Sequence, residues 1–277
     1  MAFSVHTNAA ALTALQSLNK TTEDLQQVQN RINTGLAINS AKDNASVWAI
    51  AQGQRADIGS LGAVKMSLDR ATSIADVAST AGQTISDLLV QMKEKVTAAM
   101  DPSIDTASRN ALDSDFKSIL RQITQVVQNA TFDGANLLDG SVNQIKFIAN
   151  ADATGFITLS SQNLSLGGAI ITVASTASLG TITFATNVLA QLDTSISQTN
   201  QALGNLGSQS KAISNHSTFV AQLTDQLTAG VGNLVDADLA KESANLQALQ
   251  VQQQLGTQAL AIANAAPQVI LSLFKGG

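Results

Sequence analysis

The chain has 277 residues, a formal net charge of −5 at pH 7, no cysteine, and only 13% charged and 3% aromatic residues. The acidic balance argues against a nucleic-acid partner, because proteins that bind nucleic acids carry basic patches. The lack of cysteine excludes disulfides and thiolate chemistry. With no tyrosine and a single tryptophan, Trp48, the chain must build its core from aliphatic side chains in close helix packing.

The first 33 residues predict an amphipathic helix with few charges. Leucine, valine and isoleucine recur there at steps of three, four or seven residues, which places them on one helix face. This stripe consists of Leu12, Leu15, Leu18, Leu25, Val28 and Ile32. A turn-rich linker, 34–43, follows and contains Gly35, Asn39, Ser40 and Asp43. We expect Asp43 to cap the helix after it.

The middle of the chain, 44–234, predicts long helices interrupted by β-hairpins. A helical pattern with coiled-coil spacing runs to Met100 and stops at Asp101-Pro102. A second helix follows and closes in the turn cluster NATFDGANLLDG. Between 141 and 185 four short β-prone runs, NQIKFIAN, GFITLS, AIITVAS and TITFAT, are interpreted as hairpins. The helical pattern then resumes and continues to Leu234.

The last segment, 239–277, predicts a second amphipathic helix, preceded by a linker at 235–238 with Asp236 and Asp238 as cap candidates. From Ser243 to Phe274 no side chain carries a formal charge, yet seven glutamines interrupt the apolar residues. A membrane span needs about 20 predominantly apolar residues, so we expect no membrane insertion. The neutral polar face indicates contact with other protein. The packing residues predicted are Leu246, Leu249, Leu255, Leu260, Ile262, Ile270, Leu273 and Phe274.

The layout of these elements is nearly mirror-symmetric about the hairpin region. We expect the terminal helices, 1–33 and 239–277, to pair antiparallel as one coiled-coil domain. The segment 44–234 would form a helical rod, so that the whole chain is elongated and mainly α-helical with a small β region. Two thin helices bury little between themselves, and we therefore expect neighbouring subunits to supply further packing.

The sequence offers no site for chemistry. The two histidines, His6 and His216, lie in different elements without a cysteine or an acidic residue at ligand spacing. No phosphate-binding loop or nucleophile elbow is present. The carboxylate pairs Asp113 with Asp115 and Asp236 with Asp238 are explained by helix starts and surface positions. We expect no enzyme, no cofactor and no metal.

Three segments resemble bacterial flagellins, in the order that the family has them. RINTGLAINSAKDNASVWAIA (31–51) resembles the N-terminal signature, and NATFDGANLLDG resembles the turn that closes the N-terminal core helices. The stretch from VGNLVDADLAK to VILSLF is similar to the flagellin C-terminus almost throughout. The style of these motifs resembles flagellins of alphaproteobacteria.

The resemblance implies a structural subunit that polymerises into the helical flagellar filament used for swimming. Such a subunit is secreted by the flagellar type III export apparatus without cleavage and is held by an export chaperone beforehand. It would assemble beneath a filament cap, with its terminal coiled coil lining an inner tube, 44–234 forming the tube around it, and no large outer variable domain. Its partners would be copies of itself, paralogous flagellins and the junction proteins.

The chain departs from the family pattern at two places, and each departure leads to a prediction. Many flagellins have arginine where this chain has Ala37, so a salt bridge made there in relatives would be missing. The motif recognised by the host Toll-like receptor is matched only by Gln91, Lys93 and Glu94 around Met92, and lysine in place of arginine weakens bidentate pairing. We expect a poor receptor agonist.

Two alternatives to a filament subunit stay open. A hook–filament junction protein shares the terminal helices. A coiled-coil scaffold would carry charged residues at its e and g positions, and the terminal helices lack these.

Overall fold

The computed structural model describes residues 7–275, with side chains described as far as Ala265. Its helices are α1 (Ala9–Thr34), α2 (Ala45–Ala99), α3 (Thr106–Asn129), α4 (Ile182–Val235) and α5 (Leu239–Lys275). Its strands are β1 (Thr131–Phe132), β2 (Ala135–Asn136), β3 (Gln144–Ile148) and β4 (Phe156–Ser160). The prediction of a mainly α-helical fold with a small β region mid-chain is confirmed.

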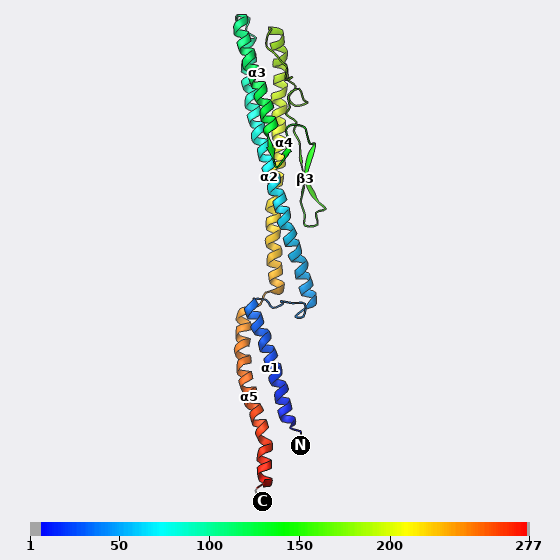
Figure 1. The fold of residues 1–277 in the computed structure, drawn as a ribbon, viewed down its shortest axis with the longest axis vertical. Coiled ribbons are helices and arrows are strands. Elements are labelled where there is room, and N and C mark those ends of the chain that lie inside the picture. The colour runs from blue at the N-terminus through cyan, green and yellow to red at the C-terminus, as the bar shows by residue number, and fades with distance from the viewer. Residues whose placement is uncertain (1–6, 276–277) are drawn as a thin grey trace. The chain divides into compact units, whose positions relative to one another are not determined.

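The chain divides into two compact units, and α2 and α4 contribute residues to both. We call the first the terminal unit; it consists of Met1–Ala56 and Gln226–Gly277. The second, Asp57–Asp225, is the central unit. Within the terminal unit α1 and α5 lie side by side (Figure 1).

The central unit is a bundle in which α2, α3 and α4 run side by side (Figure 1). Its core is aliphatic apart from two aromatic rings, Phe116 of α3 and Phe147 of β3. Cross-helix ion pairs join α2 to both neighbours: Lys93 lies 2.7 Å from Asp193, and Lys95 lies 2.8 Å from Asp115. Helices α2 and α4 approach closely at Gly82, where an added Cβ would lie 2.6 Å from Leu203 Cδ2.

The turn between α2 and α3 is fastened by the buried side chain of Arg109. Its guanidinium donates to the carbonyl of Ala99, at the end of α2, and to that of Asp101, at 3.3 Å. Ala99 is the last residue of α2, so its carbonyl has no donor within that helix. Asp105 caps α3 by accepting from Ser108 N at 2.7 Å. The predicted break at Asp101-Pro102 is therefore observed, with a cation completing the end of α2.

The predicted turn cluster after α3 is a minimal hairpin. Strands β1 and β2 are joined by Asp133 and Gly134, with φ values of 49° and 75°. Positive φ at both central residues is the requirement of a type I′ turn, for which Asp-Gly is a preferred sequence. Asp133 also pairs with Arg70 of α2 at 2.9 Å.

A second hairpin, β3–β4, is antiparallel with Phe147 opposite Ile157. Side chains of the helices hold it in place: Ile148 N donates to Ser67 Oγ at 3.2 Å, and Ser160 N donates to Gln209 Oε1 at 2.6 Å. These bonds satisfy backbone groups that a two-stranded sheet leaves open at its edges.

Two of the four predicted β runs are wrong. TITFAT begins α4, because Thr181 caps that helix: Ala185 N donates to its carbonyl at 3.0 Å and Phe184 N to its hydroxyl at 3.3 Å. AIITVAS forms a single bridge, between Leu166 and Ile171. A helix side chain also binds this segment, since Thr172 N donates to Ser195 Oγ of α4 at 3.0 Å.

Candidate functional site

The terminal helix pair consists of α1 and α5. The sequence predicts that neighbouring subunits pack against this pair. Among the described side chains, each helix has one buried or half-buried seam with alternating steps of three and four residues, the spacing of a coiled coil. On α1 the seam includes Ala11, Ala14, Leu18, Thr21, Leu25, Val28 and Ile32. On α5 it includes Glu242, Leu246, Leu249, Gln253, Gly256, Leu260 and Ala263.

Three contacts along the seam show the direction and register of the pair. Arg31 Nη1 lies 3.1 Å from Glu242 Oε1 at one end. In the middle, a Cβ added to Gly256 would lie 3.2 Å from Leu18 Cδ1. At the other end Asn8 Nδ2 donates to the carbonyl of Ala263 at 2.7 Å. Residue numbers fall along α1 as they rise along α5, so the pair is antiparallel with one register throughout.

The sequence-predicted packing residues divide between this seam and the surface. Leu25 and Val28 are buried, and five others are half-buried: Leu18, Ile32, Leu246, Leu249 and Leu260. The rest of the described set is exposed, with Leu12 at 56%, Leu15 at 42%, Leu255 at 58% and Ile262 at 72%. Ile270, Leu273 and Phe274 lie beyond the last described side chain.

The exposed members do not belong to the helix-pair seam. Val251 on α5 is also 55% exposed, and with Leu255 and Ile262 it lies at steps of four and seven residues, on one helix face. We call Leu12, Leu15, Val251, Leu255 and Ile262 the exposed apolar set. The apolar residues expected to form a single stripe on α5 thus lie on two faces of the helix. One face packs against α1, and the other is not covered by any part of the same chain.

The two linkers pair with each other inside the terminal unit. Leu36 and Asp236 form an antiparallel bridge, and the carbonyl of Val235 accepts from Ala37 N at 2.7 Å. Gly35 ends α1 in the left-handed conformation, with φ of 73°, and its carbonyl accepts from Ala237 N at 2.9 Å. The linker after α1 and the linker before α5 are therefore joined by a short ladder of backbone hydrogen bonds.

The expected cap at Asp43 is wrong, because the neighbouring Asn44 fills that place. Val47 N donates to Asn44 Oδ1 at 3.2 Å. Asp43 turns back to the linker, where its carboxylate accepts from Ser40 N at 2.9 Å and from Asn39 N at 3.1 Å. The hydrogen bond from Ser40 N is the main cause that lowers the pKa of Asp43 below its ordinary value.

Of the two cap candidates before α5, Asp238 caps the helix. Its Oδ1 accepts from Ala240 N at 3.0 Å and from Lys241 N at 3.1 Å. Asp236 lies in the linker ladder instead, where its backbone N–H donates to Gly232. The next acidic residue, Glu242, is 8% exposed and forms the ion pair with Arg31.

The residues of the weakened receptor motif lie on the surface of α2. Gln91, Lys93 and Glu94 are exposed, whereas Met92 between them is fully buried. Lys93 is held by Asp193 of α4 at 2.7 Å. The receptor expectation itself stays a prediction.

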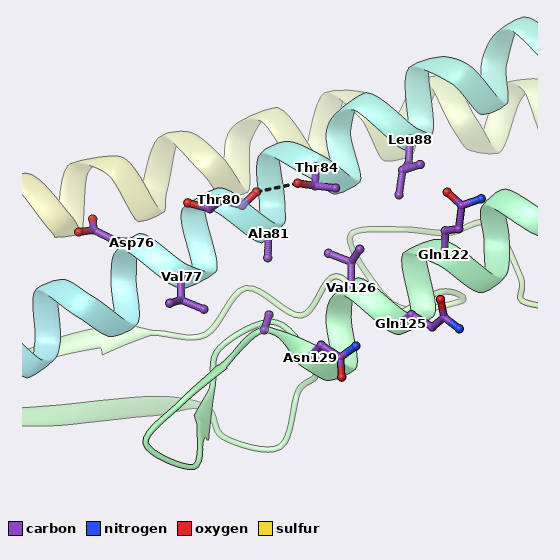
Figure 2. A pocket seen from close by; sticks show the side chains of 11 residues that line it. Asp76, Val77, Thr80, Ala81, Thr84, Leu88, Gln122, Gln125, Val126 and Asn129 are labelled. Atoms are coloured by element: carbon purple, nitrogen blue, oxygen red, sulfur yellow. Dashed lines mark hydrogen bonds between the residues drawn. The ribbon is translucent and has the colours of Figure 1, made fainter.

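A groove of about 700 Å³ lies along the seam of α2 and α3 (Figure 2). Val77, Ala81, Leu88 and Val126 point into it, and the amides of Gln122, Gln125 and Asn129 follow its α3 side. The lining carries one carboxylate, Asp76, and no histidine. The groove is an open seam between two helices and brings no catalytic groups together.

His216 forms a structural contact. Its Nε2 lies 2.7 Å from the carbonyl of Ala149, next to the β3–β4 hairpin. Within the described residues no three histidine or acidic side chains are arranged to hold a metal ion. None of the described helices is long and apolar enough to cross a membrane.

Comparison with known proteins identifies the family of this chain. The family model of the bacterial flagellin N-terminal helical region matches residues 5–143, and that of the C-terminal helical region matches 189–274. The chain belongs to the bacterial flagellin family. The two matched regions contain α1 to α3 on one side and α5 with nearly all of α4 on the other.

Flagellins are similar to this chain over its whole length. Flagellin FljJ of Caulobacter vibrioides is 54% identical, covering 100% of both chains, and flagellin FljK of the same organism is 51% identical, covering 98% of both. A flagellin of Brucella melitensis is 37% identical over 99% of both chains. The resemblance to alphaproteobacterial flagellins is confirmed.

Solved structures share the fold at low sequence identity. Bacillus cereus flagellin matches with a TM-score of 0.50 at 20% identity, over 60% of this chain and 94% of that one. A flagellar hook-associated protein from Vibrio parahaemolyticus matches with a TM-score of 0.54 at 13% identity, over 70% and 100%. Both proteins have this helical architecture, so the fold alone does not separate a filament subunit from a junction protein. The full-length identity to flagellins favours the filament subunit.

This flagellin is therefore a structural protein of the extracellular flagellar filament and not an enzyme. A filament protein polymerises with copies of itself. The exposed apolar set is a feature of the structure that needs a partner to cover it.

Proposed function

We propose that the exposed apolar set on the terminal helix pair is the surface through which neighbouring subunits pack in the filament. Monomeric soluble proteins rarely leave large apolar patches in water. Here aliphatic side chains between 42% and 72% exposed stand among neutral amides on two helices. Because this flagellin polymerises, a second copy of the chain is the partner that covers them.

The distribution of charge supports that packing. The terminal unit has six acidic and six basic side chains, whereas the central unit has 14 acidic and nine basic ones and so carries the whole net charge of −5. Like charges repel at close approach. The neutral terminal units can therefore pack tightly in the inner tube, while the acidic central units form the surrounding tube and keep the polymer soluble.

The same chemistry suits secretion through a narrow channel. The seam of α1 and α5 is thin and contains alanine, glycine and glutamine as well as leucine. Without neighbours such a pair buries little apolar area, and helices are held mostly by tertiary packing. We expect the terminal helices to be unfolded before assembly, when the flagellar export apparatus and an export chaperone bind them.

Other partners follow from the same proposal. The filament cap would guide insertion of the terminal helices at the tip, and junction proteins with similar helices would join the filament to the hook. Paralogous flagellins would pack in the same lattice, since Caulobacter vibrioides has at least five flagellins that are 49–54% identical to this chain. Motility would be the outcome of rotating that polymer.

One substitution pair tests the proposed surface. Leu255→Glu places a charge where a neighbour would bury the side chain, and Leu255→Met keeps an apolar group of similar volume. Purified monomers of each variant would be seeded with filament fragments and examined by negative-stain electron microscopy. We expect filaments from Leu255→Met and none from Leu255→Glu. Equal polymerisation of both would show that this face is not covered in the filament.

A further inference from the structure

A proline lies inside α5 and removes one of its backbone hydrogen bonds. The helix continues from Leu239 to Lys275 through Pro267, which has no N–H to donate. The acceptor of that missing bond is the carbonyl four residues earlier, at Ala263. An interior helix carbonyl without a donor needs another partner when water does not supply one.

The partner comes from the other terminal helix. Asn8 Nδ2 donates to the Ala263 carbonyl at 2.7 Å. The same side chain caps α1, because its Oδ1 accepts from Ala11 N at 3.0 Å. One amide thus completes the start of α1 and the interrupted ladder of α5 at once.

We propose that Asn8 and Pro267 together determine the register in which α1 pairs with α5. The proposal rests on the terminal helix pair being part of an assembled filament. Pro267 leaves the interior carbonyl of Ala263 without its helical donor, and only one alignment brings the amide of Asn8 to it. In the alignment shifted by one heptad, about 10 Å, Asn8 would face a carbonyl already bonded within the helix.

A register determinant is needed because the seam itself distinguishes alignments poorly. Leucine, alanine, threonine and glutamine alternate along it, and no charged residue follows Glu242 until Lys275. Seams of this kind gain register specificity from a single polar contact, as a buried asparagine does in coiled coils. The ion pair of Arg31 with Glu242 lies at the opposite end of the same seam.

The chain has no cysteine, so introduced cysteine pairs report the register without interference. A Cβ added to Gly256 lies 3.8 Å from the Cβ of Leu18, which suits a disulfide. The pair Leu18→Cys with Gly256→Cys therefore reports the observed register. The pair Leu18→Cys with Leu249→Cys reports the alignment shifted by one heptad.

Both cysteine pairs would be placed in the full chain in four backgrounds: unchanged, Asn8→Ser, Pro267→Ala, and the two combined. Serine keeps an oxygen that caps α1 but has no amide to reach α5. Alanine at 267 supplies the missing N–H, so the Ala263 carbonyl no longer depends on Asn8. Filaments would be oxidised, dissolved and analysed by non-reducing gel for intramolecular disulfides. Asn19→Ser, the same change at an exposed position of α1, is the control.

We expect the ratio of the 18–256 disulfide to the 18–249 disulfide to fall about three- to tenfold in Asn8→Ser, the effect of one net hydrogen bond. Pro267→Ala should lower the ratio similarly, although alanine strengthens the helix, and the combined variant should be no worse than either alone. A role in helix stability only would give the opposite result for Pro267→Ala.

An unchanged ratio in both single variants overturns the register proposal. If Asn8→Ser does not assemble, Pro267→Ala decides the question alone, since it keeps the cap and restores a bond. Failure of the unchanged chain to form filaments is a different result, which would contradict the proposed function instead.

Discussion

Arg31 on α1 and Glu242 on α5 form an ion pair across the terminal helix seam, with Nη1 3.1 Å from Oε1. Glu242 is 8% exposed, and its other oxygen lies 3.5 Å from Asn245 Nδ2. The pair closes the end of the seam next to the linkers. It places one charge of each sign near the end of α1 and the start of α5.

Replacing Glu242 by glutamine should weaken the terminal helix pair. The change keeps the shape but leaves the Arg31 guanidinium beside a neutral amide, at a cost of about 1–2 kcal/mol. Filaments of Glu242→Gln should depolymerise at a lower temperature than unchanged filaments, measured by light scattering. Glu23→Gln, at an exposed position of α1, is the control, and equal melting of all three polymers would contradict a role for the pair.

Two glycines of α2 should respond differently to alanine. At Gly62 an added Cβ meets nothing within 4 Å, so alanine gains up to about 1 kcal/mol of helix propensity. At Gly82 the added Cβ would lie 2.6 Å from Leu203 Cδ2, the end of a flexible and half-buried side chain, so Leu203 must shift and part of that gain is lost.

We expect Gly82→Ala to be less stable than Gly62→Ala by up to about 1 kcal/mol in urea unfolding of the purified monomer. Equal free energies of unfolding would show that α2 and α4 do not approach closely at this position.

Asp113 of α3 should make the central unit sensitive to acid. Its carboxylate accepts from Leu179 N at 2.6 Å and from Ser178 Oγ at 2.9 Å, and it pairs with Lys117 at 2.7 Å. Burial alone would raise the pKa of Asp113, but the hydrogen bonds from Lys117, Leu179 and Ser178 outweigh it and hold the pKa below the ordinary 3.8.

A depressed folded pKa contributes stability that is fully present above the unfolded value and is lost as the pH falls through the folded value. Asp113→Asn should therefore lower the free energy of unfolding by about 1–3 kcal/mol at pH 7. The difference from the unchanged chain should shrink as the pH is lowered below 3.8. A difference that stays constant down to acid pH would show that the Asp113 charge does not hold the loop before α4.

The purified monomer should be a poor agonist of the host Toll-like receptor that senses flagellins. Gln91, Lys93 and Glu94 are exposed, but Lys93 is already engaged by Asp193 and lacks the bidentate geometry of arginine. A reporter-cell assay would measure this, with a flagellin that carries the full motif as the positive control. Signalling at the level of that control would contradict the prediction.

Sequence periodicity predicted the helices well because long amphipathic patterns average over many residues. It could not separate the two faces of α5, since Leu246 and Leu249 in the seam and Leu255 and Ile262 on the exposed face are equally apolar. Only the position of α1 distinguishes them. An apolar side chain covered by its own chain and one covered by a neighbour look the same in a single sequence.

The errors occur where adjacent residues offer equivalent chemistry. Asp43 and Asn44 are both good caps, and the linker geometry selects Asn44. TITFAT has β-branched residues typical of a strand, but Thr181 is also a helix cap and α4 begins there. The Asn8 contact was missed, although Pro267 inside a helical pattern was a usable signal, because it leaves a carbonyl that must find a donor elsewhere.

Seeded polymerisation of the full chain beside a variant truncated after Leu239 tests whether α5 is required for the filament. We expect filaments from the full chain only, with the truncated variant keeping the helical circular dichroism of its central unit. Filaments from the truncated variant would contradict the claim that α5 and its exposed apolar residues hold the polymer together.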